Sequence, residues 1–219
     1  MAFWSTNMKS DKRVVDHPKI KNPVESLANT RHEFGEHGGV NMSIEASTTF
    51  TAMHPDILSG MFTGEHGPDK GGCYLYGRHF NPTVYNLSRQ LAALEGTEAA
   101  YCTASGMAAI SGTLMQLCNT GDHIVSSNTV YGGTYALLHD FLPAKANIHS
   151  TLIDINDLEA VEAAMTDKTR VVYAESIANP TLRVADIPAL AEIAHRHGAK
   201  LVIDNTFSPL ILSPKQLGA

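Results

Sequence analysis

The chain has 219 residues, of which 43% are apolar and 17% charged, and its formal net charge is -6 at pH 7. This composition is typical of a globular protein with a sizeable core, and the negative charge argues against nucleic acid or an anionic membrane as a partner. No apolar run reaches the roughly 18 residues that cross a bilayer, and the first residues printed lack the apolar core that a secretory signal would have. The three cysteines are scattered and without metal-ligand spacing, so we expect a cytoplasmic protein with no disulfide framework and no metal.

The first third of the chain has little regular pattern. Its beginning, up to about residue 21, lacks a sustained period and predicts an extended N-terminal arm. A short helix is predicted over 24–34, extended chain over 40–50, and a long irregular loop over 51–77, where glycine and proline are frequent. We expect residues 1–60 to form the arm and an interface segment.

A longer helix is predicted over 81–96. Asn81 followed by Pro82 is a helix-start signal, because Asn caps the first N–H groups and Pro is tolerated in the first turn. Apolar residues then recur at helical spacing, and Gly96 ends the pattern.

After this helix, strands and helices alternate. The predicted strands cover 99–103, 123–126, 148–152, 170–175 and 200–204, and the predicted helices cover 107–118, 134–142, 158–165 and 187–197. Such alternation favours crossover connections and a mostly parallel sheet sandwiched by helices, an α/β fold. We therefore expect residues 61–219 to form an α/β domain.

Ligands in such sheets bind beyond the carboxyl ends of the strands, which selects the candidate site residues. Ser105 and Gly106 form a turn before a helix, where unpaired N–H groups can hold a phosphate; the alternative is an ordinary N-cap and a packing glycine. Tyr131 can stack on a planar ligand or simply pack, and Asp204 either meets a cation or caps a local turn.

Arg78 lies beside Tyr76 in the glycine-containing loop. Its guanidinium can clamp a phosphate through two N–H groups, whereas the alternative is a solvated surface charge. A phosphate-binding turn, a stacking ring and a strand-end carboxylate together describe a pocket for a planar, phosphorylated cofactor with a ring nitrogen. Pyridoxal phosphate has these features.

Five motifs resemble, in order, those of the Cys/Met-metabolism family of pyridoxal-phosphate enzymes. They are YGRHFNPT at 76–83, ASGMAAI at 104–110, VYGGT at 130–134, ESIANPT at 175–181 and VIDNTF at 202–207. The resemblance extends from about Pro23 to Ala219 and is strongest to the family's methionine-cleaving lyases. It implies the large domain of a pyridoxal-phosphate-dependent transferase fold.

The resemblance also implies a role for each candidate residue. Ser105, Gly106 and Met107 would hold the cofactor phosphate from their own subunit, and Tyr76 and Arg78 would reach that phosphate across a homodimer interface. Tyr131 would stack on the pyridine ring and act as an acid or base. Asn179 would lie near the ring's phenolic oxygen, and Asp204 would pair with the protonated ring nitrogen. Two such dimers would form a homotetramer.

The implied activity is a gamma-elimination from a sulfur amino acid, with L-methionine giving methanethiol, ammonia and 2-oxobutanoate. The alternatives within the family are a cystathionine gamma-lyase or gamma-synthase and an O-acetylhomoserine sulfhydrylase. Gly133 keeps these open, because family members carry either cysteine or glycine there.

The chain departs from the family pattern at its end. The lysine that carries the cofactor should follow Asp204 shortly in a Ser-x-Thr-Lys-like context, and Lys215 has different surroundings. We therefore expect that lysine and the C-terminal domain, with the arginine that holds the substrate carboxylate, to lie beyond Ala219. A truncated, non-catalytic homologue that acts as a binding protein is the alternative of another class.

Overall fold

The computed structural model describes residues 41, 43–52, 54–70, 74–78 and 81–219. The Cα positions group them into two compact units. The first holds the described residues up to Ala93 together with Glu98–Cys102, and the second holds Leu94–Thr97 and Thr103–Ala219. The predicted N-terminal arm and the helix predicted over 24–34 fall outside the described residues. The predicted boundary at residue 60 stays a prediction.

Short helices and irregular chain make up the first unit. Its helices are η1 (Pro55–Ile57), α2 (Leu58–Phe62), η2 (Pro68–Lys70) and α3 (Pro82–Glu95), the last of which continues into the second unit. The prediction of an irregular loop over 51–77 is therefore wrong where these short helices occur. Both η1 and η2 begin at a proline, whose fixed φ favours a helical turn too short to show a period in the sequence.

The helix predicted over 81–96 is confirmed as α3. The Asn81 side chain caps it, since its Oδ1 accepts the N–H of Thr83 at 2.9 Å. Gly96 follows the helix with a φ of +72°, a left-handed conformation that glycine adopts without strain and that ends helices. The residues that cap and end α3, Asn81 and Gly96, are therefore those that the sequence predicted.

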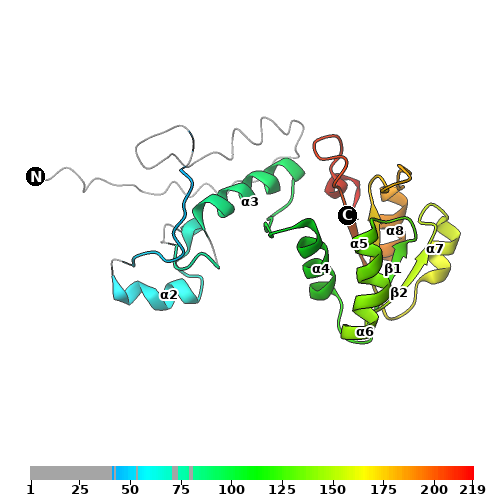
Figure 1. Ribbon diagram of the computed structural model, residues 1–219, viewed down its shortest axis with the longest axis horizontal. Helices are drawn as coiled ribbons and strands as arrows, with labels where there is room; N and C mark the ends of the chain where they lie inside the picture. Colours follow the sequence, from blue (N-terminus) through cyan, green and yellow to red (C-terminus); the bar gives the residue numbers. More distant parts are fainter. Residues whose placement is uncertain (1–40, 42, 53, 71–73, 79–80) are drawn as a thin grey trace, which may run out of the picture. The chain divides into compact units, whose positions relative to one another are not determined.

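The second unit is an α/β sandwich (Figure 1). Its elements are α4 (Gly106–Leu117), β1 (His123–Ser127), α5 (Gly132–Ala136), the π-helical turn η3 (Leu137–Phe141), α6 (Leu142–Ala146), β2 (His149–Ile153), α7 (Leu158–Ala164), β3 (Thr169–Glu175), α8 (Ile187–Arg196), β4 (Lys200–Asp204) and η4 (Pro214–Leu217). The strands form one parallel sheet in the order β2-β1-β3-β4. The predicted α/β class is confirmed.

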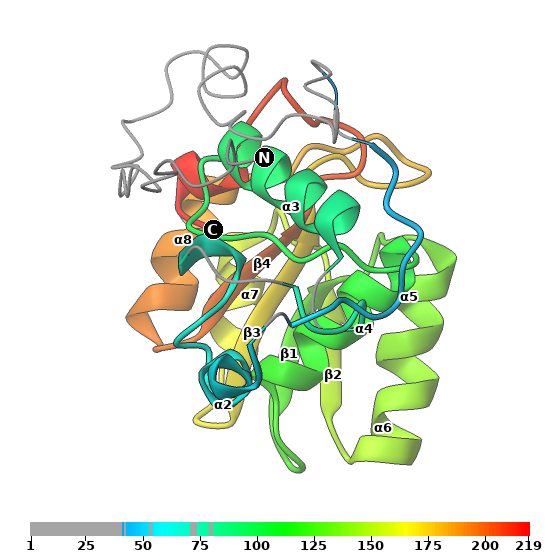
Figure 2. The ribbon, with the colours of Figure 1, turned by 90° about the vertical axis from the view of Figure 1, so that its left-hand side faces the viewer.

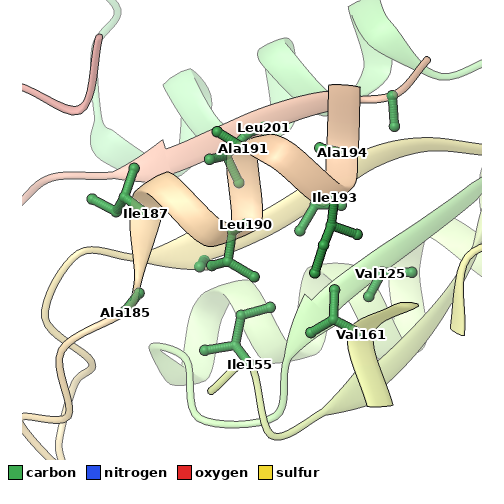
Figure 3. Packing of buried hydrophobic residues seen from close by; sticks show 13 residues of the cluster. Val125, Ile155, Val161, Ala185, Ile187, Leu190, Ala191, Ile193, Ala194 and Leu201 are labelled. Atoms are coloured by element: carbon green, nitrogen blue, oxygen red, sulfur yellow. The ribbon is translucent and has the colours of Figure 1, made fainter. Parts of the chain in front are cut away.

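Helices cover both faces of this sheet: α4, α5 and α6 lie over one face and α7 and α8 over the other (Figure 2). Successive residues of β3 accordingly belong to two separate cores. Val171 and Tyr173 pack in the cluster that contains Leu114 of α4, whereas Val172 packs in the cluster that contains Leu190 of α8 (Figure 3). Fully burying such an apolar side chain contributes roughly 1.5–3 kcal/mol, so the two cores hold the strand ends in place.

The strand predicted over 99–103 is wrong. The segment is irregular, and its Tyr101 side chain is 73% exposed. A strand needs a neighbouring strand to satisfy its backbone, and none of the described strands pairs with this one. The run also begins with two alanines, a residue type with a low propensity for strands. The other four predicted strands and four helices of this region are present, with the helix predicted over 134–142 forming part of the helical run α5-η3-α6.

Candidate functional site

A cavity of about 390 Å³ opens at the carboxyl edge of the sheet, within the second unit. It is lined by Ser105, Gly106, Met107, Ile110, Tyr131, Glu175, Ile177, Asn179, Asp204, Thr206 and Phe207. Because the chain runs from β1 to β2 on one side and returns to β3 on the other, the strand order reverses between β1 and β3. Ligands of parallel sheets bind at such a reversal, and the volume is that of a small-molecule site.

The start of α4 forms one end of the cavity. Ser105 is the N-cap, and its Oγ accepts the N–H of Ala108 at 3.1 Å. The N–H groups of Gly106 and Met107 precede the first bond within the helix and point beyond its end, where the helix dipole is positive. The Ser105 hydroxyl hydrogen is not used in capping, so the residue can cap the helix and also donate to an anion. A Cβ at Gly106 would meet nothing within 4 Å, so a ligand has room to approach.

Tyr131 lines the cavity from the loop after β1. It is the residue before α5, and its ring is half exposed. A Cβ added at Gly133 would lie 2.7 Å from Cε1 of Tyr131 and 3.0 Å from Sδ of Met107. The ring, the Met107 thioether and the α5 backbone are therefore in close contact. Tyr131 thus lines the cavity, and Gly133 limits the position of its ring.

Asp204 ends β4 with its two carboxylate oxygens in different environments. Oδ1 accepts the N–H of Thr206 at 3.0 Å and its hydroxyl at 2.5 Å, so this oxygen caps a local turn. Oδ2 accepts only a long bond of 3.4 Å from the Tyr173 hydroxyl within the described chain. Burial raises the pKa of Tyr173 well above its usual range, and the Asp204 charge raises it further, so the phenol stays a donor. The second oxygen can therefore accept a cationic N–H.

Two residues that the sequence analysis did not select support this rim, one lining the cavity and one lying below it. Glu175 ends β3 and is 6% exposed, and its carboxylate accepts the backbone N–H of Tyr131 at 2.6 Å and that of Asn179 at 2.8 Å. Tyr173 is 1% exposed and lies beneath Asp204. Glu175 follows a buried apolar strand as Asp204 does, and that position was the signal by which it could have been found.

Six of the eight predicted cofactor-binding residues thus line this cavity: Ser105, Gly106, Met107, Tyr131, Asn179 and Asp204. The other two, Tyr76 and Arg78, lie in the first unit. Tyr76 forms an isolated antiparallel bridge with Thr49, and the Arg78 guanidinium carbon lies 5.2 Å from the centre of the Tyr76 ring. The two side chains therefore form a pair, and their predicted roles at a phosphate stay predictions.

The donors and acceptors of the cavity fit pyridoxal phosphate. A helix start with a hydroxyl suits its phosphate, a half-exposed ring suits its planar face, and the Asp204 oxygen suits its protonated nitrogen. Among the described residues that line the cavity there is neither Lys nor Arg. In the described part of the chain, His, Cys, Asp and Glu side chains form no group of three or more that could hold a metal ion. No helix among the described residues is long and apolar enough to cross a bilayer.

A parallel α/β sandwich with a cavity at this rim is the architecture of the pyridoxal-phosphate-dependent enzymes of fold type I. The chain belongs to the family of Cys/Met metabolism PLP-dependent enzymes, whose model matches residues 25–219. Its similarity to the family therefore covers both described units.

Three relatives illustrate the similarity. The chain is 61% identical over 198 residues to a methionine gamma-lyase of Arabidopsis thaliana, covering 90% of this chain and 45% of the relative. It is 41% identical over 186 residues to L-methionine gamma-lyase of Pseudomonas putida, covering 84% and 45%. A putative O-acetylhomoserine (thiol)-lyase of Campylobacter jejuni, solved with a pyridoxyl-lysine phosphate, matches with a TM-score of 0.80 and 29% identity over 88% of this chain and 47% of that one. The chain thus spans about half the length of the relatives it matches.

Proposed function

We propose that the cavity at the carboxyl edge of the sheet binds pyridoxal phosphate, and that the protein catalyses gamma-elimination from a sulfur amino acid. The observation that carries the proposal is the convergence of the α4 start, the Tyr131 ring and the Asp204 carboxylate on one cavity of about 390 Å³. The similarity to two methionine gamma-lyases favours L-methionine as the substrate.

Each predicted site residue has a task in this proposal. Ser105, Gly106 and Met107 hold the phosphate, and Tyr131 covers the ring and moves protons as an acid or base. Asn179 lies near the ring's phenolic oxygen. Asp204 keeps a proton on the ring nitrogen; at about 4 Å and an effective dielectric near 20 such an ion pair is worth roughly 4 kcal/mol. When bound, the cofactor withdraws electrons from the substrate's alpha carbon.

The proposed reaction consumes one water for each methionine. The bond between the gamma carbon and sulfur breaks, and the sulfur leaves as methanethiol. The four-carbon remainder becomes 2-oxobutanoate, whose keto oxygen comes from the water, and the amino group leaves as ammonia. Tyr131, placed at the mouth of the cavity, is the group proposed to exchange protons with the substrate. A runner-up is an O-acetylhomoserine sulfhydrylase, favoured by the solved structure with that function in its name and a TM-score of 0.80.

Product analysis tests the proposal and separates the candidates. The whole gene product, purified and supplied with pyridoxal phosphate, is incubated with methionine, with cystathionine, or with O-acetylhomoserine and sulfide. We expect methanethiol and 2-oxobutanoate from methionine. Turnover of either other substrate without methanethiol from methionine would refute the lyase assignment. An Asp204→Asn variant serves as the control, because it measures any methanethiol and 2-oxobutanoate that form without an intact site.

We propose that two copies share each active site and that two such dimers form a homotetramer. The described residues that line the cavity include no Lys or Arg, and this supports the proposal because a phosphate dianion is commonly held by a cation as well as by a helix start. Arg78, paired with Tyr76 on the first unit, is the cation that the family resemblance assigns to the partner subunit's site. Light scattering of the purified protein measures the assembly.

We propose a cytoplasmic location. Cys102 and Cys118 are free thiols, and burial raises the pKa of Cys118 to about 11, so that thiol stays protonated and unreactive at neutral pH. A fluorescent fusion of the whole gene product tests the location.

A further inference from the structure

The buried carboxylate of Glu175 connects two loops of the cavity. Its Oε1 accepts the backbone N–H of Tyr131, in the loop after β1, at 2.6 Å. Its Oε2 accepts the backbone N–H of Asn179, in the loop after β3, at 2.8 Å. Glu175 itself is the last residue of β3 and is only 6% exposed. One side chain thus bridges two of the segments that line the cavity.

These two loops leave the sheet in opposite directions. The loop after β1 leads to α5 on one face, and the loop after β3 leads to α8 on the other (Figure 2). Since β1 and β3 are neighbours, the loops separate at the point where the strand order reverses. The Glu175 carboxylate spans that separation, and its two bonds set the distance between the Tyr131 and Asn179 backbones.

The arrangement requires a carboxylate rather than any polar group. Both oxygens face N–H donors, so each must accept, and only an ionised carboxylate accepts at both. A buried carboxylate is costly unless it is well bonded, and bonds from N–H groups to a charged acceptor are strong enough to offset that cost. A glutamine of the same shape would place its own N–H₂ group against one of the two N–H donors.

Tyr131 depends on this backbone anchor. It begins α5 without a capping bond from its side chain, and half of that side chain is exposed. Its ring is limited on one side by Gly133 and Met107, while the bond to Glu175 fixes its backbone at the cavity. If the anchor were lost, the ring could move away from the face that a planar ligand occupies.

We propose that Glu175 is a positioning residue that holds Tyr131 and Asn179 at the separation that pyridoxal phosphate requires. The inference rests on the proposed function, because it assumes that the cavity binds this cofactor. Glu175 acts through the two loops and does not itself take part in the proton transfers.

The test compares Glu175→Gln and Glu175→Asp with Glu192→Gln, a change of the same kind at an exposed position of α8. Equilibrium dialysis gives the affinity for pyridoxal phosphate, and circular dichroism of the saturated cofactor reports how its ring is held. Amide exchange by NMR follows the Tyr131 and Asn179 N–H groups. We expect roughly 10-fold to 100-fold weaker binding in Glu175→Gln, with a smaller dichroic band and faster exchange of those two amides.

Glu175→Asp keeps the charge but shortens the side chain, so we expect it to bind more weakly than the wild type and more tightly than Glu175→Gln. Wild-type affinity in a folded Glu175→Gln, or in Glu175→Asp should the former not fold, would overturn the proposal. So would wild-type amide exchange at both positions in the variants. Failure of the wild type itself to bind the cofactor would instead overturn the proposed function.

Discussion

At the scale of the single residue, Gly133 sets the position of the Tyr131 ring. A Cβ at residue 133 would come within 2.7 Å of that ring, closer than such atoms pack, and within 3.0 Å of the Met107 sulfur, a tight contact. The neighbouring Gly132 differs, because a Cβ there would meet nothing within 4 Å. The two glycines occupy the same helix, α5, and differ in what a methyl group would displace.

We therefore expect Gly133→Ala to shift the Tyr131 ring and weaken the binding of pyridoxal phosphate by about threefold, a modest loss because family members with cysteine at this position also carry a Cβ there. Gly132→Ala is the matched control and should bind as the wild type does. Both substitutions replace a glycine of a helix by alanine and so raise its helix propensity by a similar amount. The urea midpoint of Gly132→Ala should therefore not fall. Equal affinities in the two variants would contradict the steric role of Gly133.

Cys118 makes the folded chain less stable at alkaline pH. Burial raises the pKa of its thiol from 9.0 to about 11, and the Asp122 charge adds to the rise. Between these values the folded chain keeps a proton that the unfolded chain has lost, so the free energy of unfolding falls as the pH rises. The expected loss from pH 8 to pH 10.5 is about 2 kcal/mol.

Urea unfolding of the wild type and Cys118→Ala at these two pH values measures this loss. The substitution has its own cost from the smaller side chain, but that cost does not change with pH. Tyr173, whose pKa burial also raises, is present in both proteins and cancels in the comparison. The variant should therefore lose about 2 kcal/mol less than the wild type. Parallel losses would show that Cys118 is not the group responsible.

At the scale of the element, the start of α4 combines a helix cap with an anion site. Ser105→Ala removes the oxygen that accepts the Ala108 N–H, so we expect a loss of about 1 kcal/mol in stability and weaker cofactor binding. Ser105→Asp keeps a capping oxygen but puts a negative charge where the phosphate would lie. It should therefore unfold near the wild-type urea midpoint and bind pyridoxal phosphate more weakly than Ser105→Ala. If Ser105→Asp bound pyridoxal phosphate with wild-type affinity, the phosphate would have to lie elsewhere than at the start of α4.

The elements that could be predicted from the sequence are those with strong patterns of their own. β3 and β4 are continuous apolar runs, and α8 repeats its apolar residues at helical spacing, so one segment suffices to recognise each. The segment 99–103 is apolar too, but whether it forms a strand depends on a pairing partner elsewhere in the chain. The turns η1 and η2, which precede α3, are shorter than a helical period, so their prolines predict a loop.

The residues of the candidate site likewise fall into those that a local sequence pattern predicts and those that it does not. Asp204 and Tyr131 could be selected because parallel strands present whatever follows their carboxyl ends at one rim. Glu175 occupies an equivalent position, but its contribution consists of two distances to backbone N–H groups, which no local pattern encodes. The closeness of Gly133 to the Tyr131 ring likewise exists only after the chain has folded.

At the scale of the whole molecule, the charge of the cavity suggests how copies of the protein are organised. Within the described part of the chain, its lining contains the carboxylates of Glu175 and Asp204 but no Lys or Arg, although the proposed ligand carries a phosphate dianion. Arg78 is the cation that the family resemblance assigns to this phosphate, from the partner subunit. Arg78→Ala and Asp204→Asn should then each weaken cofactor binding, one by removing the phosphate's cation and the other by removing the partner of the ring nitrogen.

Mixing the two variants tells whether Arg78 serves its own subunit or its partner. In a mixed dimer with shared sites, one site carries both substitutions and the other carries neither. Random mixing makes half of the dimers mixed, so about one quarter of all sites should regain wild-type affinity, as measured by equilibrium dialysis after joint refolding. If Arg78 instead acts on the site of its own chain, every site in the mixture contains one defect and no tight site returns. Each variant refolded alone provides the baseline against which the recovered fraction is read.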